Sequence, residues 1–99
     1  MKHYTLATTE EYAEWYDERP KKEKLQIDSR LLKIQDEGHF GIIKDLGNDL
    51  YELKWTNGRR IYYAYFEEEN ILLLLGGNKN GQEKDIKRSR KILSTKTET

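Results

Sequence analysis

The first apolar positions along the chain repeat with the spacing of a helix. In the segment EEYAEWYDE, Tyr12, Trp15 and Tyr16 lie at i, i+3 and i+4, so their side chains share one helical face. Thr9 precedes this segment as a candidate capping residue, and acidic residues fill the first turn. The spacing predicts a short helix over residues 10–18.

A longer helical pattern follows Pro20, a residue that suits the first turn of a helix. In KKEKLQIDSRLLKIQDEG, Ile27, Leu31 and Ile34 form one apolar stripe, and Gly38 is a suitable C-terminal stop. Only a short turn separates this helix from the first. We therefore expect an antiparallel helical hairpin whose apolar stripes are covered by another part of the chain.

From Ile42 onward the pattern changes from helix to strand. The candidate strands are short runs rich in β-branched, aromatic and aliphatic residues, namely IIKDLG, LYELKW, RIYYAYF and ILLLL. The run over residues 71–75 is apolar throughout, which predicts a central strand buried on both faces. These runs predict a small twisted antiparallel sheet of three or four strands.

A third helical pattern, EKDIKRSRKIL, follows the loop GGNKNGQ. Ile86 and Leu93 share one side of this predicted helix. The opposite side carries a basic stripe of four residues, Lys84, Lys87, Arg88 and Lys91. The last six residues, STKTET, are expected to fray. Together the elements predict a single α+β domain over residues 1–99, with two helices packed on the sheet before a C-terminal helix.

Composition narrows the classes of function. Only 35% of residues are hydrophobic and 36% are charged, so seven Tyr and two Trp must supply much of the core. The absence of Cys and the presence of only two His argue against a disulfide framework, a metal site and a metal cofactor. The longest apolar run is far shorter than the roughly 20 residues of a membrane span. We expect a cytoplasmic protein without a membrane segment.

The net charge of zero conceals an asymmetry between the two halves of the chain. Residues 1–53 carry eight Lys/Arg and twelve Asp/Glu, a balance of −4, whereas residues 54–99 carry ten and six, a balance of +4. A polyanion is therefore expected to contact the second half, although a small domain also reaches such a split by carrying solvated charge everywhere.

The sequence WTNGRR contains a hairpin turn that permits two registers. A two-residue Asn-Gly turn pairs Trp55 with Arg60 and places this arginine on the aromatic face of the hairpin. A three-residue loop over residues 56–58, with Gly58 in the left-handed conformation, pairs Lys54 with Arg60 instead.

The three-residue loop is the preferred register, because it separates apolar from charged side chains and a slip of one residue turns every side chain to the wrong face. It sets Lys54 and Arg60 opposite each other, a like-charge pair that is destabilising by up to about 1 kcal/mol. Either Glu52 on the same face or an anionic ligand can compensate this repulsion.

The order of these elements resembles the RelE/ParE toxin superfamily, specifically its HigB-like or phage Gp49-like addiction module killer branch. The resemblance covers residues 10–93 and is most specific over residues 50–86, through LYELKW, NGRRIYYAYF and ILLLLGGNKNGQEKDI. It implies a RelE/ParE-like fold and the toxin of a type II toxin-antitoxin module. Its implied partners are a cognate antitoxin, through which it would oligomerise, and the ribosome with its mRNA.

Many such toxins cleave mRNA on the ribosome without a metal ion, so the resemblance implies an endoribonuclease that inhibits translation and arrests growth. Three positions carry over as catalytic. Lys54 falls where RelE-like strands carry a functional lysine, Arg60 matches the arginine of the GYR.VY motif, and Lys79 takes the place of a cation that follows the sheet. The basic stripe is the implied RNA-binding surface, formed by Lys84, Lys87, Arg88 and Lys91.

Two positions depart from the RelE pattern. Glu52 replaces a second lysine, and Asp85 stands where RelE has a catalytic tyrosine, so the general acid and base stay open among Asp85, Glu52 and a tyrosine. His39 is left outside the site, because it directly follows the helix stop. Two other functions also fit the resemblance, namely a ParE-like inhibitor that binds DNA gyrase and a decayed toxin that survives as a binding module.

Overall fold

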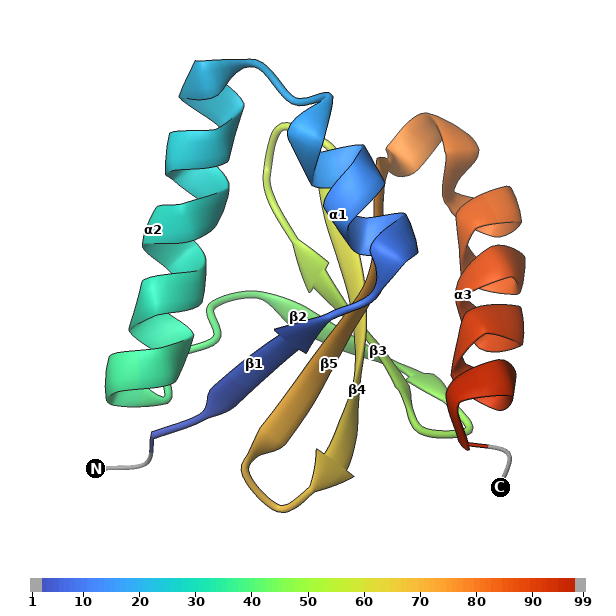
Figure 1. Ribbon diagram of the computed structural model, residues 1–99. Coiled ribbons are helices and arrows are strands. Elements are labelled where there is room, and N and C mark those ends of the chain that lie inside the picture. The colour runs from blue at the N-terminus through green and yellow to red at the C-terminus, as the bar shows by residue number, and fades with distance from the viewer. Residues whose placement is uncertain (1–2, 98–99) are drawn as a thin grey trace.

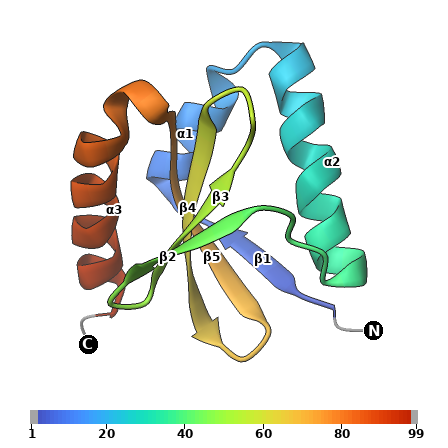
Figure 2. The same cartoon turned by 180° about the vertical axis from the view of Figure 1, so that it is seen from behind.

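The computed structural model describes residues 3–97, which form one five-stranded sheet with helices on both faces (Figures 1 and 2). In chain order the elements are β1 (Thr5–Thr8), α1 (Glu10–Asp17), α2 (Lys21–Glu37), β2 (Ile43–Gly47), β3 (Leu50–Lys54), β4 (Arg59–Glu67), β5 (Asn70–Asn78), the 3-10 helix η1 (Lys79–Gly81) and α3 (Gln82–Thr97). The strands lie in the order β1-β5-β4-β3-β2. The α+β architecture predicted from the sequence is confirmed.

The first two helices begin and end where the sequence places their signals. The hydroxyl oxygen of Thr9 accepts a hydrogen bond from the Tyr12 N–H at 3.0 Å and donates to the Leu74 carbonyl at 2.7 Å. This cap therefore also attaches α1 to β5. Gly38 ends α2 in the left-handed conformation, with φ of 66°, as a C-terminal glycine does.

The sheet separates two hydrophobic clusters. On one face, Tyr12 of α1 and Ile27 and Ile34 of α2 pack against alternate residues of the strands. On the other face, Ile92 of α3 packs in a cluster with Tyr62 of β4 and with three leucines of β5, Leu72, Leu74 and Leu75. Figures 1 and 2 accordingly show α2 and α3 on opposite sides of the sheet. No helix among residues 3–97 has the length and apolar character that crossing a membrane requires.

The sheet has five strands, where the sequence predicts three or four, and it is mixed. β1 pairs in parallel with β5, from Thr5 opposite Asn70 to Thr8 opposite Leu73. Most of β1 is exposed, and its sequence TLAT lacks an apolar alternation. The prediction of three or four antiparallel strands was therefore wrong at this edge, because a short polar edge strand is held by backbone pairing with a distant segment.

The apolar run in β5 occupies an interior position, as predicted, since β5 lies between β1 and β4 and residues 71–75 are all buried. An irregularity explains how two consecutive leucines, Leu74 and Leu75, both pack on the face of the sheet covered by α3. Tyr62 pairs with Leu75, but the next residue, Tyr63, pairs with Leu73, so Leu74 is an extra residue in the ladder.

The C-terminal helix is longer than expected. The charged and apolar pattern predicts a helix over residues 83–93, but α3 begins at Gln82 and continues to Thr97. The prediction that residues 94–97 fray was therefore wrong. The hydroxyls of Thr95 and Thr97 donate to the carbonyls of Lys91 and Leu93, one turn earlier in the helix. Residues 98–99 lie outside the described part of the chain.

Two adjacent glycines at the end of β5 allow a helix to approach closely on each face of the sheet. A methyl group at Gly76 would overlap the ring of Trp15 in α1, and one at Gly77 would overlap the carboxylate of Asp85 in α3. At this end of the sheet, side chains of α1 and α3 therefore pack directly against the backbone of β5.

The substitution Gly76→Ala is expected to destabilise the protein by about 1 to 3 kcal/mol, because Trp15 must move to accommodate the methyl group. Urea unfolding measures the change. Gly81→Ala is the matched control, since its methyl group would meet only ordinary contacts, the nearest at 3.4 Å from Asp85 Oδ2. Equal destabilisation by the two substitutions would contradict the close packing of Trp15.

Candidate functional site

The hairpin between β3 and β4 has the preferred three-residue register. Lys54 pairs with Arg60, and the Trp55 N–H donates to the Arg59 carbonyl at 3.0 Å. Gly58 has a φ of 99°, a left-handed conformation that other residues rarely adopt, and its N–H donates to the Trp55 carbonyl at 3.2 Å. The predicted register is confirmed.

This register brings the three predicted catalytic residues to one end of the sheet. Lys54 and Arg60 are direct neighbours across two strands, and Arg60 pairs on its other side with Gly77. Lys79 follows two residues later, and its N–H donates to the carbonyl of Gly58 at 2.8 Å. The aliphatic part of the Lys79 side chain lies beside Gly58, so Lys79 rests against the hairpin turn.

Arg60, however, is not the solvated cation that a bare hairpin face suggests. It is only 9% exposed, and its Nε lies 3.3 Å from Oε1 of Glu52, which has no exposed surface. This contact is an ion pair without hydrogen-bond geometry. The Arg60 Nη1 group donates to the carbonyls of Trp55 and Arg59, which leaves Nη2 as the nitrogen with which Arg60 can contact a substrate.

Glu52 therefore supplies the charge compensation that the Lys54 and Arg60 pair requires. Its second oxygen, Oε2, accepts a hydrogen bond from Nε2 of Gln82 at 2.8 Å, which ties the pair to the first residue of α3. Because Glu52 is fully buried and held by two partners, it is not placed to touch a substrate. Sequence reasoning missed Gln82, for which the sequence offers no signal beyond its position after the glycine-rich loop.

Tyr62 of β4 lies near this ion pair, and Asp85 in the first turn of α3 lies near Tyr62. Burial raises the pKa of the Tyr62 hydroxyl, and the nearby Glu52 and Asp85 carboxylates raise it further. Burial also raises the pKa of Asp85, an effect that Arg88 and Lys84 partly offset. Asp85 is partly exposed, whereas Tyr62 is buried, so of the two only Asp85 has access to solvent.

All four residues of the predicted basic stripe are exposed on α3, as its periodicity indicates. They do not face the same surroundings. Arg88 and Lys91 line a hollow that Glu11 of α1 also lines, and Arg88 borders a second hollow with Glu14 and further acidic residues. Lys84 and Lys87 line neither hollow, and Lys84 lies close enough to Asp85 to lower the pKa of that carboxyl.

The arrangement can bind and polarise a phosphate group. Lys54 and Lys79 carry ammonium groups at the hairpin end of the sheet, and Arg60 in the neighbouring strand has one guanidinium nitrogen that is not bound by the described residues. Such preorganised donors stabilise charge that develops on a phosphorus centre, by roughly 3 kcal/mol each. Within residues 3–97, no cluster of three or more His, Cys, Asp or Glu is placed to hold a metal ion.

Comparison with known proteins gives three findings. Residues 14–96 match the protein family described as phage derived protein Gp49-like. An uncharacterized protein of Haemophilus influenzae is 36% identical over 70 residues, which span 68% of this chain and 69% of that protein. Solved structures of RelE toxins share the fold.

A variant of E. coli toxin RelE in the free state aligns with a TM-score of 0.71 and 18% identity, over 92% of this chain and 99% of that chain. RelE in the RelBE2 toxin-antitoxin complex of Mycobacterium tuberculosis aligns with a TM-score of 0.64 and 13% identity, over 78% and 99%. At this identity the likeness shows a shared fold alone.

Replacing Arg60 by Ala is expected to destabilise the protein by about 3 kcal/mol, because it leaves the buried Glu52 carboxylate without its cation. Lys54→Ala, in the facing strand, should change stability by no more than about 0.5 kcal/mol. Thermal unfolding of both variants compares them. If Glu52→Gln fails to recover stability in the Arg60→Ala background, the ion pair is not the cause.

Asp85→Asn is expected to stabilise the protein at pH 7 and to have less effect at pH 3. A pKa raised on folding means that the native state holds this proton more readily than the unfolded chain, so stability falls as pH rises through the range between the two pKa values. Thermal unfolding across this pH range measures the effect. Glu83→Gln, an exposed carboxylate in the same helical turn, is the control and should not reproduce the pH dependence.

Proposed function

The chain belongs to the family of phage-derived Gp49-like proteins within the RelE/ParE superfamily, and on this premise we propose that it is the toxin of a type II toxin-antitoxin module. It acts in the cytoplasm as a ribosome-dependent endoribonuclease that cuts mRNA without a metal ion. The cuts inhibit translation and arrest growth. A cognate antitoxin neutralises the toxin and mediates its oligomerisation.

The observation that supports this proposal most directly is the meeting of Lys54, Arg60 and Lys79 at the hairpin end of a RelE-like sheet. In the proposed reaction, the 2′-hydroxyl of one nucleotide loses its proton and attacks the adjacent phosphorus. The bond to the 5′ oxygen breaks and this oxygen takes up a proton, which gives a 2′,3′-cyclic phosphate and a 5′-hydroxyl. The three cations stabilise the additional negative charge on the phosphorus centre.

In the proposed reaction the three cations have different roles. Lys54 and Lys79 carry flexible ammonium groups on partly or fully exposed side chains, so they can follow the phosphate as its geometry changes. Arg60 is fixed by Glu52 and two carbonyls, so it contributes a positioned donor. The exposed stripe of α3 contacts RNA phosphates through Lys84, Lys87, Arg88 and Lys91.

A second function from another class is inhibition of DNA gyrase by binding alone, as in ParE-like members of the superfamily. The acidic residues of α1 that border Arg88 and Lys91 favour a surface that binds protein, since they weaken the attraction of this part of α3 for a polyanion. This alternative requires no cluster of cations at the hairpin.

Induction of the protein without an antitoxin, followed by mapping of mRNA 5′ ends, tests the proposed reaction. We expect cuts associated with codons that disappear in Lys54→Ala and Lys79→Ala, because each removes a donor to the phosphate without unfolding the protein. Lys44→Ala, an exposed cation of β2, is the control and should cut normally. Intact transcripts together with DNA-damage signalling would point to gyrase instead.

A further inference from the structure

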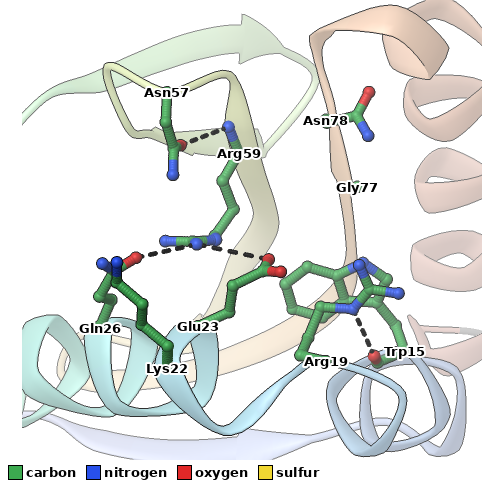
Figure 3. Close-up of a pocket in the computed structure, with 9 residues that line it drawn as sticks. All are labelled: Trp15, Arg19, Lys22, Glu23, Gln26, Asn57, Arg59, Gly77 and Asn78. Carbon is green, nitrogen blue, oxygen red and sulfur yellow. Dashed lines mark hydrogen bonds and ion pairs between the residues drawn. The ribbon is translucent and has the colours of Figure 1, made fainter.

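A second cation site lies on the opposite face of the same hairpin. The side chains of Arg59 and Arg60 leave β4 toward opposite faces of the sheet, so Arg59 points toward α2. There a cavity of about 480 Å³ opens between the start of α2, the hairpin tip and the end of β5 (Figure 3). None of the residues assigned to RNA cleavage above lines this cavity.

Arg59 is the anchor of this cavity. It is only 5% exposed, and its Nη2 donates to Oε1 of Gln26 at 3.0 Å and lies 3.4 Å from Oε1 of Glu23. Its Nε and Nη1 are buried and have no hydrogen-bond partner among the described residues. A buried charged donor without a partner is unfavourable, so Arg59 is left with unused hydrogen-bonding capacity beside an open cavity.

Two asparagines line the cavity. The Oδ1 atom of Asn57 accepts from the Arg59 N–H at 3.0 Å, and Oδ1 of Asn78 accepts from the Asn80 N–H at 2.9 Å. Each asparagine therefore uses its oxygen locally and leaves its amide nitrogen free to donate. In Figure 3 the amide nitrogen of Asn57 points toward the level of the Arg59 guanidinium group, whereas the side chain of Asn78 points away from Arg59.

The charges around the cavity favour an anion. Arg19 and Lys22 line it together with Arg59, and Glu23 is the carboxylate that faces them, which gives three positive charges against one negative. Glu23 is 35% exposed, so its side chain can move into solvent when another anion approaches Arg59. The cavity thus combines the positive charges of Arg19, Lys22 and Arg59 with the amide donor of Asn57.

We propose that this cavity binds a phosphate-bearing nucleotide of the RNA substrate, at a position away from the bond that is cut. The inference rests on the proposed function, because the RNA is the ligand that would reach both faces of the hairpin. The cavity volume is suited to a nucleotide, and Trp15 provides an aromatic wall beside the cations. An acidic segment of a protein would use the same donors and is the competing occupant.

Binding to single-stranded RNA tests the proposal on the full chain. The probe is an oligonucleotide with 2′-O-methyl groups, which cannot be cleaved by its own 2′-hydroxyl, so binding is measured independently of the reaction. Fluorescence anisotropy at several salt concentrations gives the affinity and its salt dependence. Lys22→Ala should reduce the slope of log K against log salt by about 0.7, the value for one phosphate contact with a single strand.

Two isosteric substitutions make the test sharper. Asn57→Asp and Asn78→Asp keep the oxygen that accepts the local backbone N–H but replace the free donor by a negative charge, so the loops should keep their shape. Each should weaken RNA binding about tenfold or more. Glu23→Gln should strengthen binding, because it removes the carboxylate that competes for Arg59.

Lys33→Ala provides the matched control, since Lys33 is an exposed cation of the same helix outside the cavity. Unchanged RNA binding in Lys22→Ala, Asn57→Asp and Asn78→Asp, or losses equal to that in Lys33→Ala, would overturn the proposal. Cleavage that depends on Lys54 would still stand in that case. Conversely, RNA binding that depends on the cavity in a protein that cuts no mRNA would support the cavity and refute the nuclease.

Discussion

The left-handed conformation of Gly58 is the constraint on which the rest of the site depends. It inserts one additional residue into the hairpin, and the register of β3 and β4 follows from that insertion. Because side chains alternate along a strand, a two-residue turn would exchange the faces of Arg59 and Arg60. Each arginine would then lose the acidic partner that it has now, Glu23 for one and Glu52 for the other. The whole distribution of positive charge around the hairpin thus depends on a single backbone conformation.

The hairpin is held against α2 by a second interaction that the sequence does not reveal. The guanidinium of Arg30 lies 4.3 Å from the ring centroid of Trp55, and that of Arg59 lies 5.4 Å from it. Arg30 also donates to the carbonyls of Phe40, Ile42 and Lys54, and burial lowers its pKa. The partly buried side chain of Arg30 thus links three carbonyls around the hairpin through three of its donors. Trp55 therefore contacts both Arg59, which lines the cavity, and Arg30 of α2.

Periodicity alone predicted most of the fold, and local chemistry limited the rest. The helices with Tyr12 and Ile27 in their buried stripes, the four longer strands and the hairpin register could all be predicted, because each depends on residues close together in the sequence. Strand β1 could not, since its place is set by pairing with β5 across more than sixty residues. The burial of Arg60 was missed for the same reason, because the start of α3 covers Glu52 through Gln82. The cavity at Arg59 likewise joins α2, the hairpin and β5, which no single stretch of sequence contains.

The two neighbouring arginines differ in how firmly their charge is neutralised, and this difference decides what each can do. The carboxylate beside Arg60 is fully buried and is also bound by Gln82, so moving it would leave the buried charge of Arg60 without a partner. The carboxylate beside Arg59 is partly exposed, and an ion pair with such a group contributes little to stability. An incoming anion can therefore displace Glu23 far more readily than Glu52. Although Arg59 is the more buried of the two, its charge is the more available to a ligand, and Lys54 and Lys79 must supply most of the mobile charge on the other face.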